Sequence, residues 1–225
     1  MISQYSRRNA LQIVGSSAVL ALAGCTTPEK QNESQNQTQF QEPTRDDFAF
    51  DINIEKQFTE NHPARINITL SNISDSPITI STGPTPPFTT YLSGSESDEH
   101  RLILNPNVSE DRNPLDWIGE NNPIPNTDKN LCWNVTQDVI IDDVGRVTVI
   151  EPEETIGQTY DVYRYQSEKC LQDVDYKFKD TFSIEMGEQS VVDTLVELEL
   201  EFTLSINGEQ SLHIKNRGLD VLAPE

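Results

Sequence analysis

The chain has 225 residues and carries 16 Lys and Arg against 37 Asp and Glu, a formal net charge of −21. This balance excludes a nucleic-acid partner, because phosphate binding requires a basic face. The acids are spread along the chain and lysines are few, which favours a surface built for high salt, where charge is screened within a few ångströms. The alternative is an acidic face for a cation or a basic partner.

Residues 1–24 have the order of an export signal. Arg7 and Arg8 form a positive start, and residues 10–24 that follow carry no charge. This stretch matches the apolar part of a signal peptide and is shorter than the roughly twenty residues that span a bilayer. The twin arginines favour the Tat export route.

The signal ends in Leu22-Ala23-Gly24-Cys25, which resembles the lipobox of lipoprotein signal peptides. The resemblance implies that the Cys25 thiol carries a diacyl- or dialkyl-glycerol and that cleavage leaves Cys25 as the first residue. Two lipid chains on one residue are enough for stable anchoring. The alternative is an uncleaved membrane helix with an incidental cysteine.

Removing residues 1–24 takes away Arg7 and Arg8 and no acid, leaving 14 basic and 37 acidic residues and a formal charge of −23. Tat export, a lipobox and this acidity together resemble a haloarchaeal surface lipoprotein. The implied location is the extracellular face of the cell membrane, with the membrane as a partner through Cys25.

Residues 25–45 are rich in Gln, Asn, Thr and Glu and nearly lack aliphatic side chains. Such a segment cannot bury enough apolar surface to fold, so it is predicted to be a flexible polar linker. Residues 46–225 are then the folded domain, of a length that suits one domain.

Residues 46–225 show alternation of apolar and polar side chains, which predicts β-strands with one face in the core. The clearest case is 196–206, where aliphatic and acidic residues alternate, and Asn207-Gly208 then predicts a two-residue type I′ turn. The alternating segments are 48–55, 66–71, 78–80, 102–104, 147–149, 160–162, 176–178, 182–184, 196–206 and 212–214.

Short strands separated by Pro, Gly, Asn and Asp turns predict an all-β fold, an antiparallel β-sandwich. The segment Ile68–Ile80, ITLSNISDSPITI, resembles the strand-turn-strand of extracellular immunoglobulin-like domains, including those of the intracellular proteinase inhibitor type. The resemblance implies an immunoglobulin-like sandwich and says little about function.

Residues 105–130 interrupt the strand pattern with four prolines, and a loop this long is either functional or disordered. Trp117 lies in it and is a candidate binding residue. The alternative is that Trp117 folds back as part of a lid over one end of the sandwich.

Three cysteines are present, so lipidation of Cys25 leaves Cys132 and Cys170 as a pair. Outside the membrane such a pair is most simply a disulfide. Two buried free thiols are the alternative. Trp133, next to Cys132, is expected to pack against the disulfide.

No catalytic or metal-binding motif stands out. His62, His100 and His213 lie in separate segments, no Gly-x-Ser-x-Gly elbow is present, and the ligand set of a blue-copper site is missing. The acidic pairs and triplets near 142, 151 and 173 do not match EF-hand spacing. We therefore expect no cofactor, no metal and no enzymatic activity.

Asn-x-Ser/Thr sequons are candidate glycan acceptors in an exported chain. Asn107 lies in the long loop and is the strongest candidate, Asn67 points outward by the strand alternation, and Asn134 is a third. The other sequons begin at Asn32, Asn36 and Asn72.

The sequence thus predicts a lipid-anchored extracellular module that binds an unknown protein or small molecule without catalysis. A proteinase inhibitor or envelope-maintenance domain is one alternative, in which the loop around Trp117 would enter a protease cleft. A hydrolase whose site the sequence does not reveal is another.

Overall fold

The computed structural model describes residues 42–94, 100–119, 124–125, 128, 130–166, 170, 174–186 and 196–222. The predictions for Arg7, Arg8, Cys25 and most of the linker lie outside these residues. Residues 39–225 belong to one compact unit. No helix among the described residues is long and apolar enough to cross a membrane.

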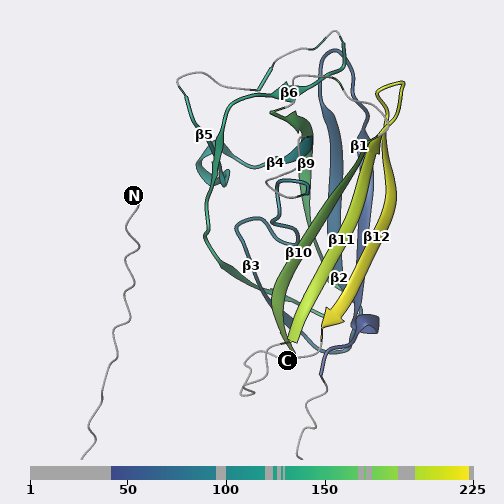
Figure 1. The fold of residues 1–225 in the computed structure, drawn as a ribbon. Helices are drawn as coiled ribbons and strands as arrows, with labels where there is room; N and C mark the ends of the chain where they lie inside the picture. Colours follow the sequence, from purple (N-terminus) through teal and green to yellow (C-terminus); the bar gives the residue numbers. More distant parts are fainter. Residues whose placement is uncertain are drawn as a thin grey trace, which may run out of the picture. The chain divides into compact units, whose positions relative to one another are not determined.

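The fold is an antiparallel β-sandwich, which confirms the predicted class (Figure 1). The first sheet has the order β1-β2-β9-β4 and consists of β1 (Phe48–Lys56), β2 (Ala64–Asn72), β9 (Thr155–Tyr165) and β4 (Arg101–Pro106), with β6 (Asn134–Val135) paired in parallel with β9. The second has the order β12-β11-β10-β3-β8 and consists of β12 (Leu212–Leu222), β11 (Val196–Ile206), β10 (Val174–Met186), β3 (Ile78–Thr82) and β8 (Arg146–Ile150).

The strand order is that of an immunoglobulin-like sandwich. In chain order, β1, β2, β3, β4, β9, β10 and β11 occupy the places of strands A to G, with A-B-E-D in one sheet and G-F-C in the other. Two edge strands are added to the second sheet, β12 beside β11 and β8 beside β3. The insertion between β4 and β9 contains η2 (Glu110–Arg112), β5 (Leu115–Trp117), β6, β7 (Val139–Ile141) and β8, and a short 3-10 helix, η1 (Arg45–Asp47), precedes β1.

The core lies between the two sheets and follows the predicted alternation. In β11, all six residues from Val196 to Ile206 at even positions are buried, and in β2 the buried side chains are those at even positions from Ala64 to Asn72. Three aromatic rings form the centre: Phe178 stacks on Phe202 at 4.9 Å, and Phe88 contacts both.

Strands β1 and β12 close one side of the sandwich. They lie next to each other, and Asp51 of β1 forms an ion pair with Arg217 of β12. At the end of β1, the Gln57 amide donates to the carbonyl of Leu212 and accepts from its N–H. The two sheets are therefore joined by hydrogen bonds as well as by the core.

The Asn72–Pro77 turn, part of the immunoglobulin-like resemblance, is built around a buried amide. The Asn72 side chain donates to the carbonyls of Ser76 and Ile150, each at 2.8 Å, and accepts from the N–H and hydroxyl of Ser74. The bond to Ile150 joins the turn to β8 of the other sheet. Because the Asn72 side chain is fully buried, the asparagine of this sequon has a structural role in the folded domain.

Two strand-level predictions need correction, those for Asn207-Gly208 and for Val147 and Val149. Asn207-Gly208 is not a two-residue type I′ turn: β11 and β12 are linked by residues 207–211, the Gln210 N–H donates to the Asn207 carbonyl, and the residue with positive φ is Gln210. The predicted segments 176–178 and 182–184 form one strand, β10, which continues through Asp180 with this side chain facing the core. In β8, Val147 and Val149 face solvent and Ile150 faces the core.

Candidate binding surface

The insertion between β4 and β9 carries the most unusual surface of the described residues. Its strands β5 and β7 form a separate antiparallel pair, with Leu115 opposite Ile141 and Trp117 opposite Val139. Residues 115–118 and 138–141 are called the β5–β7 ribbon below. This pair was not predicted, because β5 lies within residues 105–130, which interrupt the strand pattern, and β7 has only three residues.

The β5–β7 ribbon exposes branched aliphatic side chains. Ile118 and Ile140 are each 53% exposed and share the face of the ribbon that carries Asp116, whereas Ile141 is exposed on the other face, where its partner Leu115 is buried. Exposed large apolar residues scattered singly are ordinary, but a group of them on one element is typical of a contact surface. The ribbon is therefore our candidate binding surface.

Trp117 lies at the end of β5 and is half-buried. Its side chain packs against the core cluster together with Val139, its partner in β7. The indole thus contributes to holding the ribbon on the sandwich, and the binding role predicted for Trp117 remains a prediction.

The rest of the insertion is fastened to the first sheet. Trp133 is buried, its indole N–H donates to the Thr59 carbonyl at 2.8 Å, and its ring meets Tyr163 edge-on at 6.4 Å. Tyr163 lies on β9, and burial raises the pKa of its hydroxyl above the ordinary range. These contacts make a rigid base for the ribbon.

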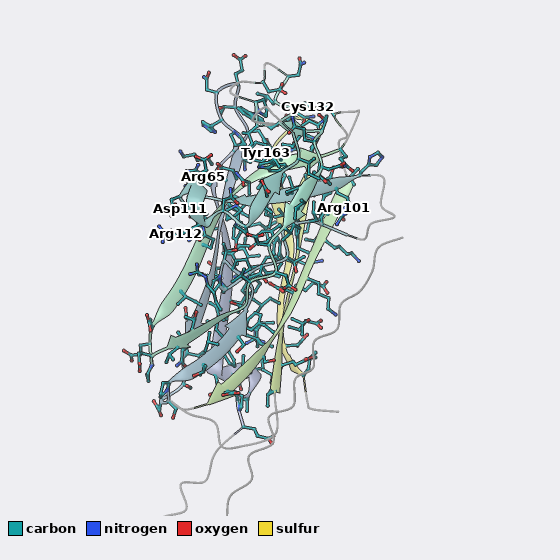
Figure 2. All side chains as sticks on the ribbon, turned by 90° about the vertical axis from the view of Figure 1, so that its left-hand side faces the viewer. Arg65, Arg101, Asp111, Arg112, Cys132 and Tyr163 are labelled. Carbon is teal, nitrogen blue, oxygen red and sulfur yellow. A yellow bond between two sulfur atoms is a disulfide. The ribbon has the colours of Figure 1, made fainter. Side chains whose placement is uncertain are left out.

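The predicted disulfide is present and ties the insertion to the segment that follows β9. Cys132 and Cys170 are joined, with their Cα atoms 5.5 Å apart. Figure 2 shows Cys132 toward one end of the sandwich, above Tyr163 and Arg65 in the view.

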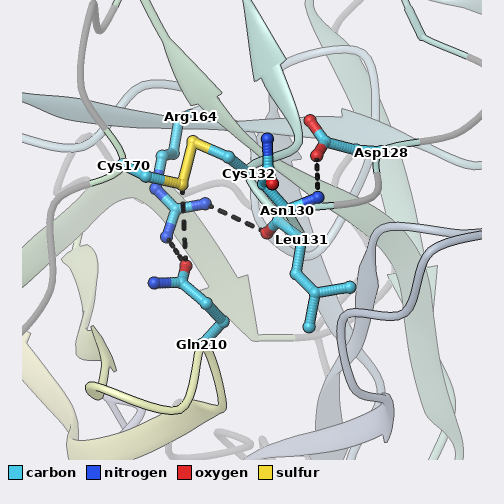
Figure 3. The surroundings of a disulfide bond; sticks show 7 residues. All are labelled: Asp128, Asn130, Leu131, Cys132, Arg164, Cys170 and Gln210. Atoms are coloured by element: carbon cyan, nitrogen blue, oxygen red, sulfur yellow. Dashed lines mark hydrogen bonds between the residues drawn. A yellow bond between two sulfur atoms is a disulfide. The ribbon is translucent and has the colours of Figure 1, made fainter.

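A buried guanidinium stands beside the disulfide (Figure 3). Arg164 is 1% exposed; it donates to the Gln210 side-chain oxygen at 2.5 Å and lies over the Phe58 ring at 5.7 Å. The same Gln210 oxygen lies 3.8 Å from the Cys170 sulfur. Burial lowers the pKa of Arg164, and the arrangement joins the β11–β12 turn to β9 and the insertion.

A second buried polar group holds the loop after β3. The Asp180 carboxylate accepts from the Thr89 N–H at 2.5 Å and the Thr89 hydroxyl at 3.0 Å. Burial raises the pKa of Asp180, although the bonds from Thr89 oppose the shift. The Tyr160 hydroxyl of the opposite sheet donates to the Phe88 carbonyl in the same loop.

One shallow hollow lies beside this loop, on the outer face of β10. Its volume is about 250 Å³, and Leu92, Lys177, Lys179 and Glu201 line it. Lys179 is already paired with Glu199 at 2.7 Å. The hollow is smaller than typical ligand pockets, so a surface contact explains binding better than this hollow does.

The sequons fall in different settings. Asn107 is exposed just after β4, and Asn67 lies on β2, half-exposed on the outer face of the first sheet. Asn134 is half-buried in β6 where it pairs with β9. Among these, Asn107 has the freest setting for a glycan.

The histidines are not brought together. His62 lies in the β1–β2 connection with its ring on the Pro63 carbonyl, His213 lies on β12 beside Asn207, and His100 precedes β4. Within the described ranges, no three His, Cys, Asp or Glu residues are grouped so as to hold a metal ion. Asp173 lies outside the described residues.

No protein-family model, curated protein or solved structure matches the chain. The fold assignment therefore depends on the strand order described above.

Proposed function

We propose that the protein is a non-catalytic binding module, exported by the Tat route and anchored by lipid at Cys25 on the outer face of the cell membrane. The observation that carries the binding role is the β5–β7 ribbon, which presents Ile118, Ile140 and Ile141 to solvent. The export and anchoring are supported by the twin arginines and by Leu22-Ala23-Gly24-Cys25.

The setting of the ribbon supports recognition of a protein. An aliphatic surface on a strand pair suits a protein partner with its own apolar patch, since burying apolar area stabilises such contacts at about 25 cal/mol per Å². Asp116 lies opposite Ile140 in the ribbon and adds a charge beside the apolar group. The Cys132–Cys170 disulfide and the Trp133 contacts hold the surrounding insertion in place before binding, which lowers the entropic cost.

The test is co-purification from detergent-solubilised membranes in molar salt, with the tagged wild-type chain and an Ile118→Ser/Ile140→Ser variant. We expect a protein that the wild type retains and the double variant loses. Ile73→Ser is the matched control, because Ile73 is 56% exposed but lies in the β2–β3 turn. Equal retention by the double variant would rule out the ribbon as the binding surface.

The hydrolase and proteinase-inhibitor predictions have their own tests. Turnover abolished by His100→Ala or His213→Ala in a high-salt substrate screen would support a hydrolase in place of a binding module. Inhibition of secreted proteases that is lost in a Trp117→Ala variant would support an inhibitor.

A further inference from the structure

The outward face of the β5–β7 ribbon alternates between isoleucine and aspartate. Asp116 and Ile118 lie on this face of β5, with Ile140 opposite Asp116 and Asp138 opposite Ile118, and all four side chains are exposed. A further backbone hydrogen bond from the N–H of Asp142 continues the register, so exposed Asp142 follows Ile140 on the same face. Each isoleucine thus has a carboxylate as its neighbour both along its strand and across the pair.

The carboxylates on this face have no basic partner within the described part of the chain. Asp116, Asp138 and Asp142 form no ion pair with a described Lys or Arg, and Asp138 accepts a hydrogen bond from the neutral Gln166 side chain. Four acids on the two main sheets do have such partners, in the pairs Asp51–Arg217, Asp161–Arg65, Asp175–Lys215 and Glu199–Lys179. The ribbon therefore combines exposed apolar area with carboxylates whose charge the described residues do not neutralise.

We propose that the partner of the β5–β7 ribbon is a basic segment of another protein, in which apolar side chains alternate with Lys or Arg. This inference rests on the proposed function and names the chemistry of the partner at the same surface. Directly opposite residues of an antiparallel pair have Cβ atoms about 4.5–5.5 Å apart. A partner that covers Ile140 must therefore also remove water from the carboxylate of Asp116.

The cost of removing that water selects a partner with cations. Burying a carboxylate is unfavourable unless a cation or hydrogen-bond donors replace its water. An uncharged apolar patch would gain from contact with Ile118 and Ile140 but would leave the Asp116 carboxylate without compensation. A Lys or Arg side chain satisfies both groups, because its aliphatic stem covers isoleucine and its charged end pairs with the carboxylate.

The same charges disfavour other occupants of this face. A second copy of the chain carries a formal charge of −21 and would bring more carboxylates to the ribbon. Like charges placed together across an interface oppose binding, and an anionic lipid surface meets the same repulsion. Charge complementarity therefore favours a basic protein segment over a second copy or a membrane.

The test compares three fluorescent peptides as probes of the full chain in detergent: four Lys-Val repeats, four Lys-Ser repeats and four Glu-Val repeats. Dissociation constants are measured by fluorescence anisotropy at about 0.5 M potassium chloride, where a Debye length of about 4 Å screens general attraction to an acidic chain. We expect the Lys-Val peptide to bind at least about tenfold more tightly than either of the other two.

Matched variants locate the binding on the ribbon. Ile118→Ser/Ile140→Ser and Asp116→Lys should each weaken binding of the Lys-Val peptide at least about tenfold. Ile73→Ser and Asp75→Lys are the controls, because both residues are exposed in the β2–β3 turn and the substitutions make the same chemical changes. Each control should change the dissociation constant by less than about twofold.

Three results would overturn the proposal: no binding of the Lys-Val peptide, equal binding of the Lys-Val and Lys-Ser peptides, or equal effects of Asp116→Lys and Asp75→Lys. The co-purification described for the proposed function separates the two claims. A protein that Ile118→Ser/Ile140→Ser loses and Asp116→Lys retains would support the binding role and overturn the basic partner. Equal retention by the double isoleucine variant would contradict the binding role itself.

Discussion

At the residue scale, Asn72 shows how one side chain can fix a turn and join two sheets. Its side chain is fully buried and makes four hydrogen bonds, so Asn72→Ala leaves the carbonyls of Ser76 and Ile150 without that donor. We expect a loss of about 2–4 kcal/mol in the free energy of unfolding, measured by chemical denaturation. Asn67→Ala, on the outer face of the same strand, should change stability by less than about 0.5 kcal/mol. Similar effects of both substitutions would contradict the role given to Asn72.

Asp180 gives the domain a pH dependence with a defined sign. Burial raises its pKa above the ordinary value of 3.8, so the folded state holds this proton more tightly than the unfolded state does. The contribution of Asp180 to stability is therefore greatest below about pH 4 and is lost as the pH rises through the raised pKa. Asp180→Asn removes this titration.

The measurement is the difference in free energy of unfolding between wild type and Asp180→Asn, followed across pH. We expect the advantage of the wild type to shrink from pH 4 upward until the raised pKa is passed. A difference that stays constant over this range would show that Asp180 titrates normally in the folded protein.

At the element scale, the disulfide connects the insertion to the main sandwich. Cys132 and Cys170 are separated by 38 positions, for which the chain-entropy model assigns about 4 kcal/mol to the cross-link. The Cys132→Ala/Cys170→Ala double variant should lose up to that amount in thermal or chemical unfolding. Proteolysis of the variant in the native state should first cut within the insertion, and first cuts in β10–β11 instead would contradict this view of the cross-link.

The strands also show which sequence patterns are sufficient to predict a strand and its buried face. The long alternation of 196–206 is enough to predict both a strand and its inner face, because all six even positions are apolar. The pattern of β8 does not decide which face of the strand is buried, because Val147 and Val149 at odd positions favour one face and Ile150 at an even position favours the other. Only the pairing with β3 decides between the two faces. The β5–β7 ribbon could not be predicted, since each strand has only three residues and depends on a distant partner.

Single polar residues explain the remaining features of the fold that the sequence pattern did not predict. Asp180 occupies a core-facing position of β10 that the alternation does not explain, and the bonds from Thr89 compensate its buried carboxylate. Gln210 adopts a positive φ, and its side-chain oxygen accepts a hydrogen bond from Arg164. The sequence around Gln210 indicates neither this backbone conformation nor the contact with Arg164. The disulfide was predicted from the cysteine count, with Cys25 assigned to lipidation, together with the expected location outside the membrane; the structure decides against the alternative of two free thiols.

At the scale of the whole molecule, net charge should govern stability in salt. A chain with a formal charge of −21 repels itself in dilute buffer, and at 1 M salt the Debye length falls to about 3 Å. We expect the unfolding temperature to rise steadily from about 0.1 M to 2 M potassium chloride. An unchanged or falling unfolding temperature would contradict a surface adapted to high salt.

Lipid anchoring at Cys25 is the central claim about the molecule as a whole, because it sets where the β5–β7 ribbon would act. The most direct measurement is the intact mass of the mature protein extracted from membranes, with Cys25→Ser as the comparison. We predict a wild-type chain that begins at Cys25 and carries two lipid chains, and no lipid on the variant. A wild-type mass that begins at Met1, or that matches a mature chain without lipid, would contradict the account.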